Sequence, residues 1–314
     1  MEKRRKSWRF RLVIAQGLSR LGLLAFALGA WSCGEEKEEV RREAEVPGGG
    51  RLAAAGNVVD ELVALQFRTV RADDRLVTGA GLQLTVIQQD GLQEPSEVAD
   101  EIAEKTGSDV FGVRADVSRV DDIRRLVSAV AERFGTIDIL VTNAGGPPAG
   151  TFQTLDEEAW AGAFRMNLVS VVELCRATVP YMKKKGWGRI INITSISVKQ
   201  PVDGLMLSNS LRAGVIGFAK TLSQELAPDN ILINNVCPGF TMTERVEQLA
   251  DAMADSKNVT RNDVLREWEA TIPLNRIGTP PEFSALVAFL ASERASYITG
   301  TTIPIDGGAV KGLL

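Results

Sequence analysis

From about residue 95 to residue 308 the chain alternates between short apolar segments and longer segments of helical periodicity. In Asp121–Phe134, for example, apolar side chains recur three and four residues apart, and Gly135 follows as a helix C-cap. Ile137–Val141 comes next and is largely apolar and β-branched, as in a buried strand. Strands that alternate with helices pair in parallel and are covered on both faces. The pattern therefore predicts an α/β fold with a doubly wound parallel sheet.

The same criteria place the other elements of this Rossmann-like fold. Thr154 and Glu157 have the spacing of a capping box, which predicts the start of a helix at that point. In a sheet of this kind ligands bind at the carboxyl ends of the strands, so the site is expected there. The expected helices are Glu97–Thr106, Asp121–Phe134, Met166–Lys185, Leu205–Leu226 and Glu282–Leu290, and the expected strands are Asp109–Val113, Ile137–Val141, Arg189–Ile193, Ile231–Val236 and Thr302–Ile305.

The N-terminal part of the chain has a different character. Residues 2–11 are strongly basic, and Leu21–Trp31 is an uncharged run. We expect residues 1–50 to be an irregular extension, a basic and apolar segment followed by a charged linker. A single Rossmann-fold domain is expected over residues 51–314, most regular from about residue 95 and with a lid insertion at 240–275.

Two locations are compatible with this extension. A basic head, a short apolar centre and small residues have the outline of a signal peptide, so export or lipid anchoring through residues 1–33 is one alternative. The apolar run is too short for a stable membrane span. Cys33, Cys175 and Cys237 are far apart and form no paired motif, which suits a reducing compartment. We expect a cytoplasmic protein.

Composition excludes several classes of function. The chain contains no histidine, so no imidazole base or imidazole metal ligand is available, and no metal site is expected. Its net charge is −4 and aromatic residues make up only 6% of it, which argues against nucleic acid as a partner.

Small and polar residues gather where the expected strands end. A Thr-Asn-Ala-Gly turn follows the strand at 137–141, and a turn of this kind lets a planar ligand approach the backbone. An Asp-Val pair follows the preceding strand, and a Pro-Gly pair follows the strand at 231–236. The residues at these places are Asp116, Val117, Asn143, Ala144, Gly145, Pro238 and Gly239, and their role as candidate cofactor-binding residues comes from the resemblance described next.

In order and spacing, over roughly 210 residues, these motifs resemble the short-chain dehydrogenase/reductase family, and most closely its 3-oxoacyl-acyl-carrier-protein reductases. The resemblance implies NAD or NADP as cofactor and a small carbonyl or secondary alcohol as substrate. It implies that Asn167 orders a water by kinking its helix. It also implies a homodimer or homotetramer that pairs the helices at 166–185 and 205–226.

The catalytic positions depart from the family pattern of Ser, Tyr and Lys. Ser195 occupies the serine position, but Ser208 stands where the family has tyrosine and Arg212 where it has lysine. An aliphatic hydroxyl is a far weaker acid than a phenol, whose pKa is about 10. An arginine stays protonated, so Arg212 can bind a cofactor hydroxyl or phosphate but cannot pass protons. The candidate catalytic residues are Asn167, Ser195, Ser208 and Arg212.

The glycine-rich phosphate loop of the family has no intact copy. One candidate is the strand Arg11–Ala15 followed by 16–23, and the other is the loop 76–81 followed by a strand at Leu82–Ile87. The residue that selects NAD or NADP follows the second strand, so this choice stays open. A reading-frame shift or a fused upstream segment would explain the change in pattern near residue 93.

Three hypotheses follow, in this order. The first is an NAD(P)-dependent oxidoreductase with an atypical active site, in which Ser208 or water supplies the proton. The second is a non-catalytic relative that binds a nucleotide or a partner. The third is a defective product whose first strands are improperly made.

Overall fold

The computed structural model describes residues 10–15, 82–88 and 95–313. Their strands form one seven-stranded parallel sheet in the order β3-β2-β1-β4-β5-β6-β7. This confirms the predicted doubly wound α/β fold. The strands are β1 Phe10–Ala15, β2 Leu82–Gln88, β3 Asp109–Arg114, β4 Ile139–Thr142, β5 Gly188–Ile193, β6 Ile231–Pro238 and β7 Thr302–Ile305.

The strand order reverses at β1, which lies between β2 and β4. Both strands proposed near the N-terminal end, Arg11–Ala15 and Leu82–Ile87, are present, and they pair with each other in parallel. The two candidate phosphate loops, 16–23 and 76–81, lie outside the described residues. In sheets of this type the ligand crosses the strand ends where the order reverses, next to β1 and β4 here.

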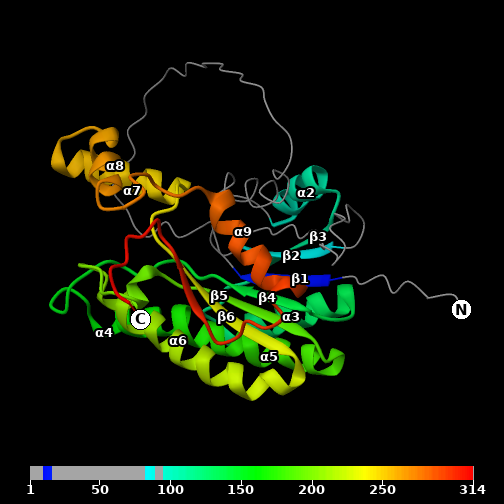
Figure 1. The fold of residues 1–314 in the computed structure, drawn as a ribbon. Coiled ribbons are helices and arrows are strands. Elements are labelled where there is room, and N and C mark those ends of the chain that lie inside the picture. Colours follow the sequence, from blue (N-terminus) through cyan, green and yellow to red (C-terminus); the bar gives the residue numbers. More distant parts are fainter. Residues whose placement is uncertain (1–9, 16–81, 89–94, 314) are drawn as a thin grey trace, which may run out of the picture.

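Helices cover both faces of the sheet. Helices α3, α5 and α6 pack on one face around buried residues such as Leu126, Leu174 and Val215, and α2 and α9 pack on the other (Figure 1). Strands β4 to β6 are almost continuously buried, as expected of a sheet covered on both sides. The helices are α2 Pro95–Thr106, α3 Val120–Phe134, α4 Glu157–Phe164, α5 Ser170–Lys185, α6 Met206–Leu226, α7 Glu244–Lys257, α8 Arg261–Glu269 and α9 Pro280–Ala291.

Helix ends follow the predicted caps with one exception. Gly135 adopts the left-handed conformation after α3, as expected, and Gly186 does the same after α5. The capping box predicted at Thr154 is wrong, because the N-cap of α4 is Asp156, whose side chain accepts from the Ala159 amide. The Thr154 hydroxyl instead accepts from the Thr151 amide at 2.9 Å and closes a turn before the helix.

The segment 240–275, which the sequence predicted to be a lid insertion, has an apolar cluster of its own. Trp268 of α8 stacks on Phe240, with ring centroids 4.8 Å apart, and Val264 and Ala250 are fully buried beside them. Figure 1 shows α7 and α8 standing apart from the sheet and its two helix layers. Among the described residues, no helix is long and apolar enough to cross a membrane.

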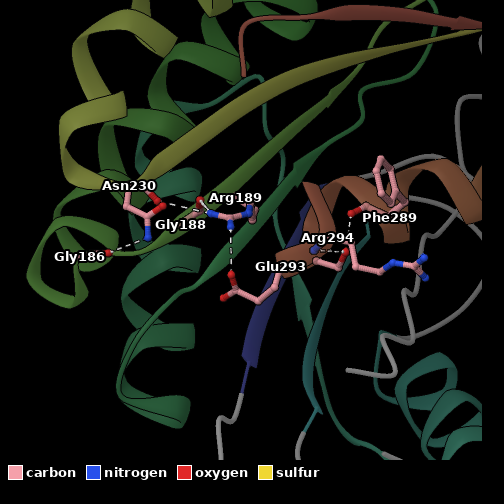
Figure 2. Close-up of polar contacts among 8 residues, drawn as sticks. Gly186, Gly188, Arg189, Asn230, Phe289, Glu293 and Arg294 are labelled. Atoms are coloured by element: carbon pink, nitrogen blue, oxygen red, sulfur yellow. Dashed lines mark hydrogen bonds and ion pairs between the residues drawn. The ribbon is translucent and has the colours of Figure 1, made fainter. Parts of the chain in front are cut away.

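A buried arginine lies at the opposite end of β5 from the candidate site. The Arg189 guanidinium donates to the Gly188 and Asn230 carbonyls at 2.9 and 3.4 Å (Figure 2). It also lies 4.3 Å from the Trp187 ring centroid. Burial lowers its pKa, and the carboxylate of Glu293, 3.7 Å away, opposes that shift. The group ties β5 to the turn before β6 and to the segment after α9.

Candidate active site

The predicted site residues follow strands that all run in the same direction. Ala144 and Gly145 come after β4, Ser195 comes after β5, and Pro238 ends β6. Because the strands are parallel, these residues share the carboxyl edge of the sheet. Arg212 on α6 donates to the Ile193 carbonyl at this edge. Asn167, in the helical turn before α5, donates to the Gly145 carbonyl at the same edge.

Asn167 lies in a π-helical turn, Arg165–Val169, between α4 and α5. Its amide nitrogen donates to the Gly145 carbonyl at 2.9 Å, and the residue is 2% exposed. Its amide oxygen is buried and has no hydrogen-bond partner among the described residues. A buried acceptor of this kind is normally satisfied by a water or a ligand. The resemblance implied a helix kink at Asn167, and the π-helical turn distorts the helix at this residue.

Arg212 is buried at 8% exposure and reaches from α6 to the ends of two strands. Its guanidinium donates to the carbonyls of Ile193, Ala144 and Gly145 at 3.2, 3.0 and 3.4 Å. Burial lowers its pKa to about 10, with a smaller opposing effect from Cys237. Arg212 is therefore still a cation at neutral pH, and much of its donor capacity is used by the backbone.

Ser195 and Ser208 are connected by a third serine. The Ser195 hydroxyl oxygen accepts from the Ser197 amide at 3.1 Å. The hydroxyl oxygens of Ser197 and Ser208 lie 3.1 Å apart, and both residues are buried. Sequence reasoning missed Ser197, for which the only signal was a second hydroxyl two residues after Ser195.

Cys237 is buried next to this cluster. Its sulfur lies 3.2 Å from the Thr194 hydroxyl, and its pKa is raised, mainly by burial. The thiol is thus kept neutral beside Ser195.

A chain of buried polar side chains crosses the sheet just behind the site. The Thr142 hydroxyl donates to Asn192 at 2.8 Å, and Asn192 donates to Asn235 at 3.0 Å. Asn235 in turn donates to the Thr302 hydroxyl at 3.2 Å. This chain fixes the alignment of β4, β5, β6 and β7, and it was not expected from the sequence.

The Asp116-Val117 pair, named above as a candidate for cofactor binding, follows β3. Asp116 accepts from the Ser118 amide at 2.8 Å and from its hydroxyl at 2.7 Å, and Val117 is buried. The Asp116 amide donates to Asp122 at 3.1 Å, which lowers the pKa of that carboxyl. The turn is thereby fixed against the start of α3.

The Pro238-Gly239 turn packs against Asp306, which is followed by two glycines after β7. A Cβ on Gly239 would lie 2.8 Å from that of Asp306, so a side chain does not fit there. Gly307 and Gly308 both adopt positive φ angles of 64° and 88°, which favours glycine at both positions. The close contact at Gly239 therefore holds this end of β6 against the residues that follow β7.

Neither tyrosine of the chain replaces the missing phenol. Tyr297 is fully exposed after α9, and Tyr181 packs against the helix layer formed by α3, α5 and α6. The Lys220 ammonium donates to the Gly300 carbonyl at 3.1 Å, away from Ser195. Within the described part of the chain, no cluster of three or more acidic or thiol side chains could hold a metal.

Comparison with known proteins places this site in context. The family model described as enoyl-(acyl carrier protein) reductase matches residues 75–310. The 3-oxoacyl-acyl-carrier-protein reductase FabG of Chlamydia muridarum is 35% identical over 230 residues, which are 73% of this chain and 87% of the relative. D-beta-hydroxybutyrate dehydrogenase of Rhizobium meliloti is 32% identical over 240 residues, covering 74% and 91%.

Two solved structures are similar over most of the fold. The L-sorbose reductase of Gluconobacter frateurii, complexed with NADPH and L-sorbose, has a TM-score of 0.71 at 30% identity, covering 74% of this chain and 89% of its own. A single-residue variant of the actinorhodin polyketide ketoreductase, solved with NADPH, has a TM-score of 0.72 at 25% identity, covering 96% and 98%.

Proposed function

The chain belongs to the short-chain dehydrogenase/reductase family of NAD(P)-dependent oxidoreductases, and we propose that it is an NADPH-dependent reductase with an atypical active site. The substrate class that we propose is a 3-oxoacyl thioester or a related ketone, by analogy with the FabG relatives. The choice of NADPH rests on the similar structures that were solved with it. We also propose a homodimer or homotetramer formed through α5 and α6.

The observation that carries this proposal is the arrangement of Asn167, Arg212 and Ser195 around the ends of β4 and β5. The unpaired amide oxygen of Asn167 fits an ordered water beside Gly145. The residues after β3, β4 and β6 fit a nucleotide along the strand ends, with Asp116 and Val117 on the adenine side and Asn143 and Gly239 on the nicotinamide side. The residues expected to hold the pyrophosphate lie outside the described part.

The proposed roles follow from the chemistry of each group. When bound, NADPH supplies the hydride that a carbonyl carbon accepts. Ser195 uses its hydroxyl proton to polarise the carbonyl oxygen, because its own oxygen already accepts from the Ser197 amide. Ser208 or a water held by Asn167 delivers the proton. Arg212 fixes the strand ends and faces the cofactor with its remaining donors. Losing a phenolic acid lowers the rate roughly 10²–10⁴-fold without abolishing turnover.

Turnover on a substrate panel tests the proposal. The purified protein is incubated with NADPH and one member of a panel of 3-oxoacyl thioesters, quinones and simple ketones. NADPH oxidation is followed by the loss of the reduced cofactor's absorbance. We expect slow oxidation with at least one substrate and none without substrate. NADPH binding with no oxidation on any substrate would reject the reductase.

One observation favours a second function, that of a non-catalytic nucleotide-binding protein. The Ser208 hydroxyl is buried against Ser197, and Arg212 bonds to three backbone carbonyls, so both groups already have hydrogen-bond partners within the protein. The double variant Ser208→Tyr, Arg212→Lys separates the two functions. Under the first proposal it increases an existing turnover by about tenfold or more. Under the second, activity appears only in the variant.

A further inference from the structure

The turn after β5 contains one side chain to which no role has been assigned. Ser197 lies in the single turn of 3-10 helix Ile196–Val198, directly after Ser195. It is 4% exposed, and its hydroxyl contacts Ser208, which is 6% exposed and lies on α6. This contact joins the turn to the helix across 11 residues of sequence.

We propose that Ser197 is a positioning residue for the reaction, which aligns Ser195 and Ser208 relative to each other. The inference rests on the proposed reductase function and deepens it. Ser197 acts through two different groups, its backbone amide on Ser195 and its hydroxyl on Ser208. A change of side chain at this position therefore affects only the contact with Ser208.

The amide contact determines which way the Ser195 proton points. A serine hydroxyl has one proton to donate and can accept two hydrogen bonds. The Ser195 oxygen accepts from the Ser197 amide at 3.1 Å, so that side of the oxygen is occupied by a donor. The Ser195 proton is consequently directed away from the turn, which leaves it for a substrate oxygen.

The hydroxyl contact holds the shorter side chain that replaces the family's tyrosine. A serine side chain in a helix has several staggered rotamers, and only some of them place its oxygen near the substrate. The Ser197 hydroxyl, 3.1 Å from that of Ser208, favours one rotamer. It also gives Ser208 a buried hydrogen-bond partner, so the Ser208 oxygen is satisfied without a mobile water.

A double-mutant cycle tests the inference with the full chain. The variants are Ser197→Ala, Ser208→Ala and the double variant, and kcat and KM are measured with NADPH and the best substrate of the panel. Ser197→Thr keeps a hydroxyl at the same position. Ser210→Ala is the matched control, because its hydroxyl donates only to the Met206 carbonyl on the exposed side of α6. NADPH affinity and the thermal midpoint are measured for every variant.

We expect Ser197→Ala to lower kcat about tenfold and to change the KM for NADPH less than about twofold, because it affects the reacting geometry and not cofactor binding. Ser197→Thr restores most of kcat, Ser210→Ala leaves it unchanged, and the double variant is no slower than Ser208→Ala alone.

An unchanged kcat in Ser197→Ala overturns the inference. So does a double variant in which the two losses multiply, since Ser197 then acts independently of Ser208. If the unsubstituted protein binds NADPH but turns over no substrate, the proposed function fails and this inference fails with it.

Discussion

Arg212 joins the two strand ends on which the candidate site rests. Its guanidinium holds the carbonyls of Ile193 and Ala144, which are close in space but far apart in sequence. The planar guanidinium of an arginine has several donors and can bridge two strands, whereas the ammonium of a lysine is a compact point charge. At this position the chain therefore has a rigid connection between β4 and β5 and a buried positive charge.

Replacing Arg212 by methionine tests this connection. The variant removes the donor of the Ile193 and Ala144 carbonyls, while the Gly145 carbonyl keeps the Asn167 amide, so we expect the free energy of unfolding to fall by about 2–4 kcal/mol. Urea unfolding followed by circular dichroism measures the change. In the control Arg124→Met, an exposed arginine paired with Asp121 is lost, and the expected change is below about 0.5 kcal/mol. Equal stability of the two variants would show that Arg212 is not a structural connection.

The residues named from the sequence and those missed differ in a physical way. Ser195, Ser208 and Arg212 could be named because the resemblance supplies the family's spacing of Ser, Tyr and Lys. Ser197 and Asn192 could not be placed, because their importance lies in contacts with residues far along the chain. Their hydroxyl and amide groups look like ordinary turn and strand residues until the strands are aligned.

At the scale of elements, the sequence predicted the strands and helices well and their ends less well. Apolar periodicity identified α3 and β5 to within about two residues. The start of α4 was misplaced because Thr154 and Asp156 are both good N-caps, and the Thr151–Thr154 turn leaves the cap to Asp156. The π-helical turn at Asn167 carries no local sequence signal and came from the resemblance alone.

Helix α9 begins with a capping box that also contains an ion pair, and it gives a prediction on pH. Glu282 accepts from the Thr279 amide at 2.8 Å and pairs with both terminal nitrogens of Arg276. These contacts, with Arg276 the largest, lower its pKa from 4.5 to about 2. Because the folded-state pKa is depressed, the stabilisation is complete above about pH 4.5 and is lost as the pH falls towards 2.

The variant Glu282→Gln should therefore be less stable than the unsubstituted protein at about pH 6, by about 1 kcal/mol. The difference should narrow as the pH is lowered from about 4.5 to about 2. Thermal midpoints of the variant and of the unsubstituted protein, taken across this pH range, measure the difference in stability. Glu267→Gln is the control, because Glu267 forms one surface pair with Lys257. A difference that does not change with pH would contradict the assignment.

For the whole molecule, the notable feature is that the central strand comes from the N-terminal segment of the chain. Strand β1 comes from residues 10–15, inside the segment that the sequence set apart from the regular fold, while the family model matches only residues 75–310. The strand nonetheless pairs with β2 on one side and β4 on the other. A fused upstream segment, or one read in a shifted frame, would explain a strand that pairs within the sheet but lies outside the residues matched by the family model.

Deleting residues 1–15 tests the place of this strand. Without β1 the sheet loses the strand that connects β2 to β4, so we expect the truncated chain to lose cooperative unfolding and to aggregate. A truncation of residues 1–8, which leaves β1 intact, is the control and should keep the thermal midpoint. A chain that folds equally well without residues 10–15 would show that another segment occupies the centre of the sheet.

The central claim is that a nicotinamide nucleotide lies across the ends of β3, β4 and β5. Titration of the purified protein with NADPH, followed by the enhancement of the reduced cofactor's fluorescence, tests it most directly, with NADH titrated in parallel. We predict saturable binding of NADPH at micromolar to submillimolar concentration, weaker binding of NADH, and competition by NADP⁺. The absence of saturation with either cofactor at millimolar concentration would contradict the claim.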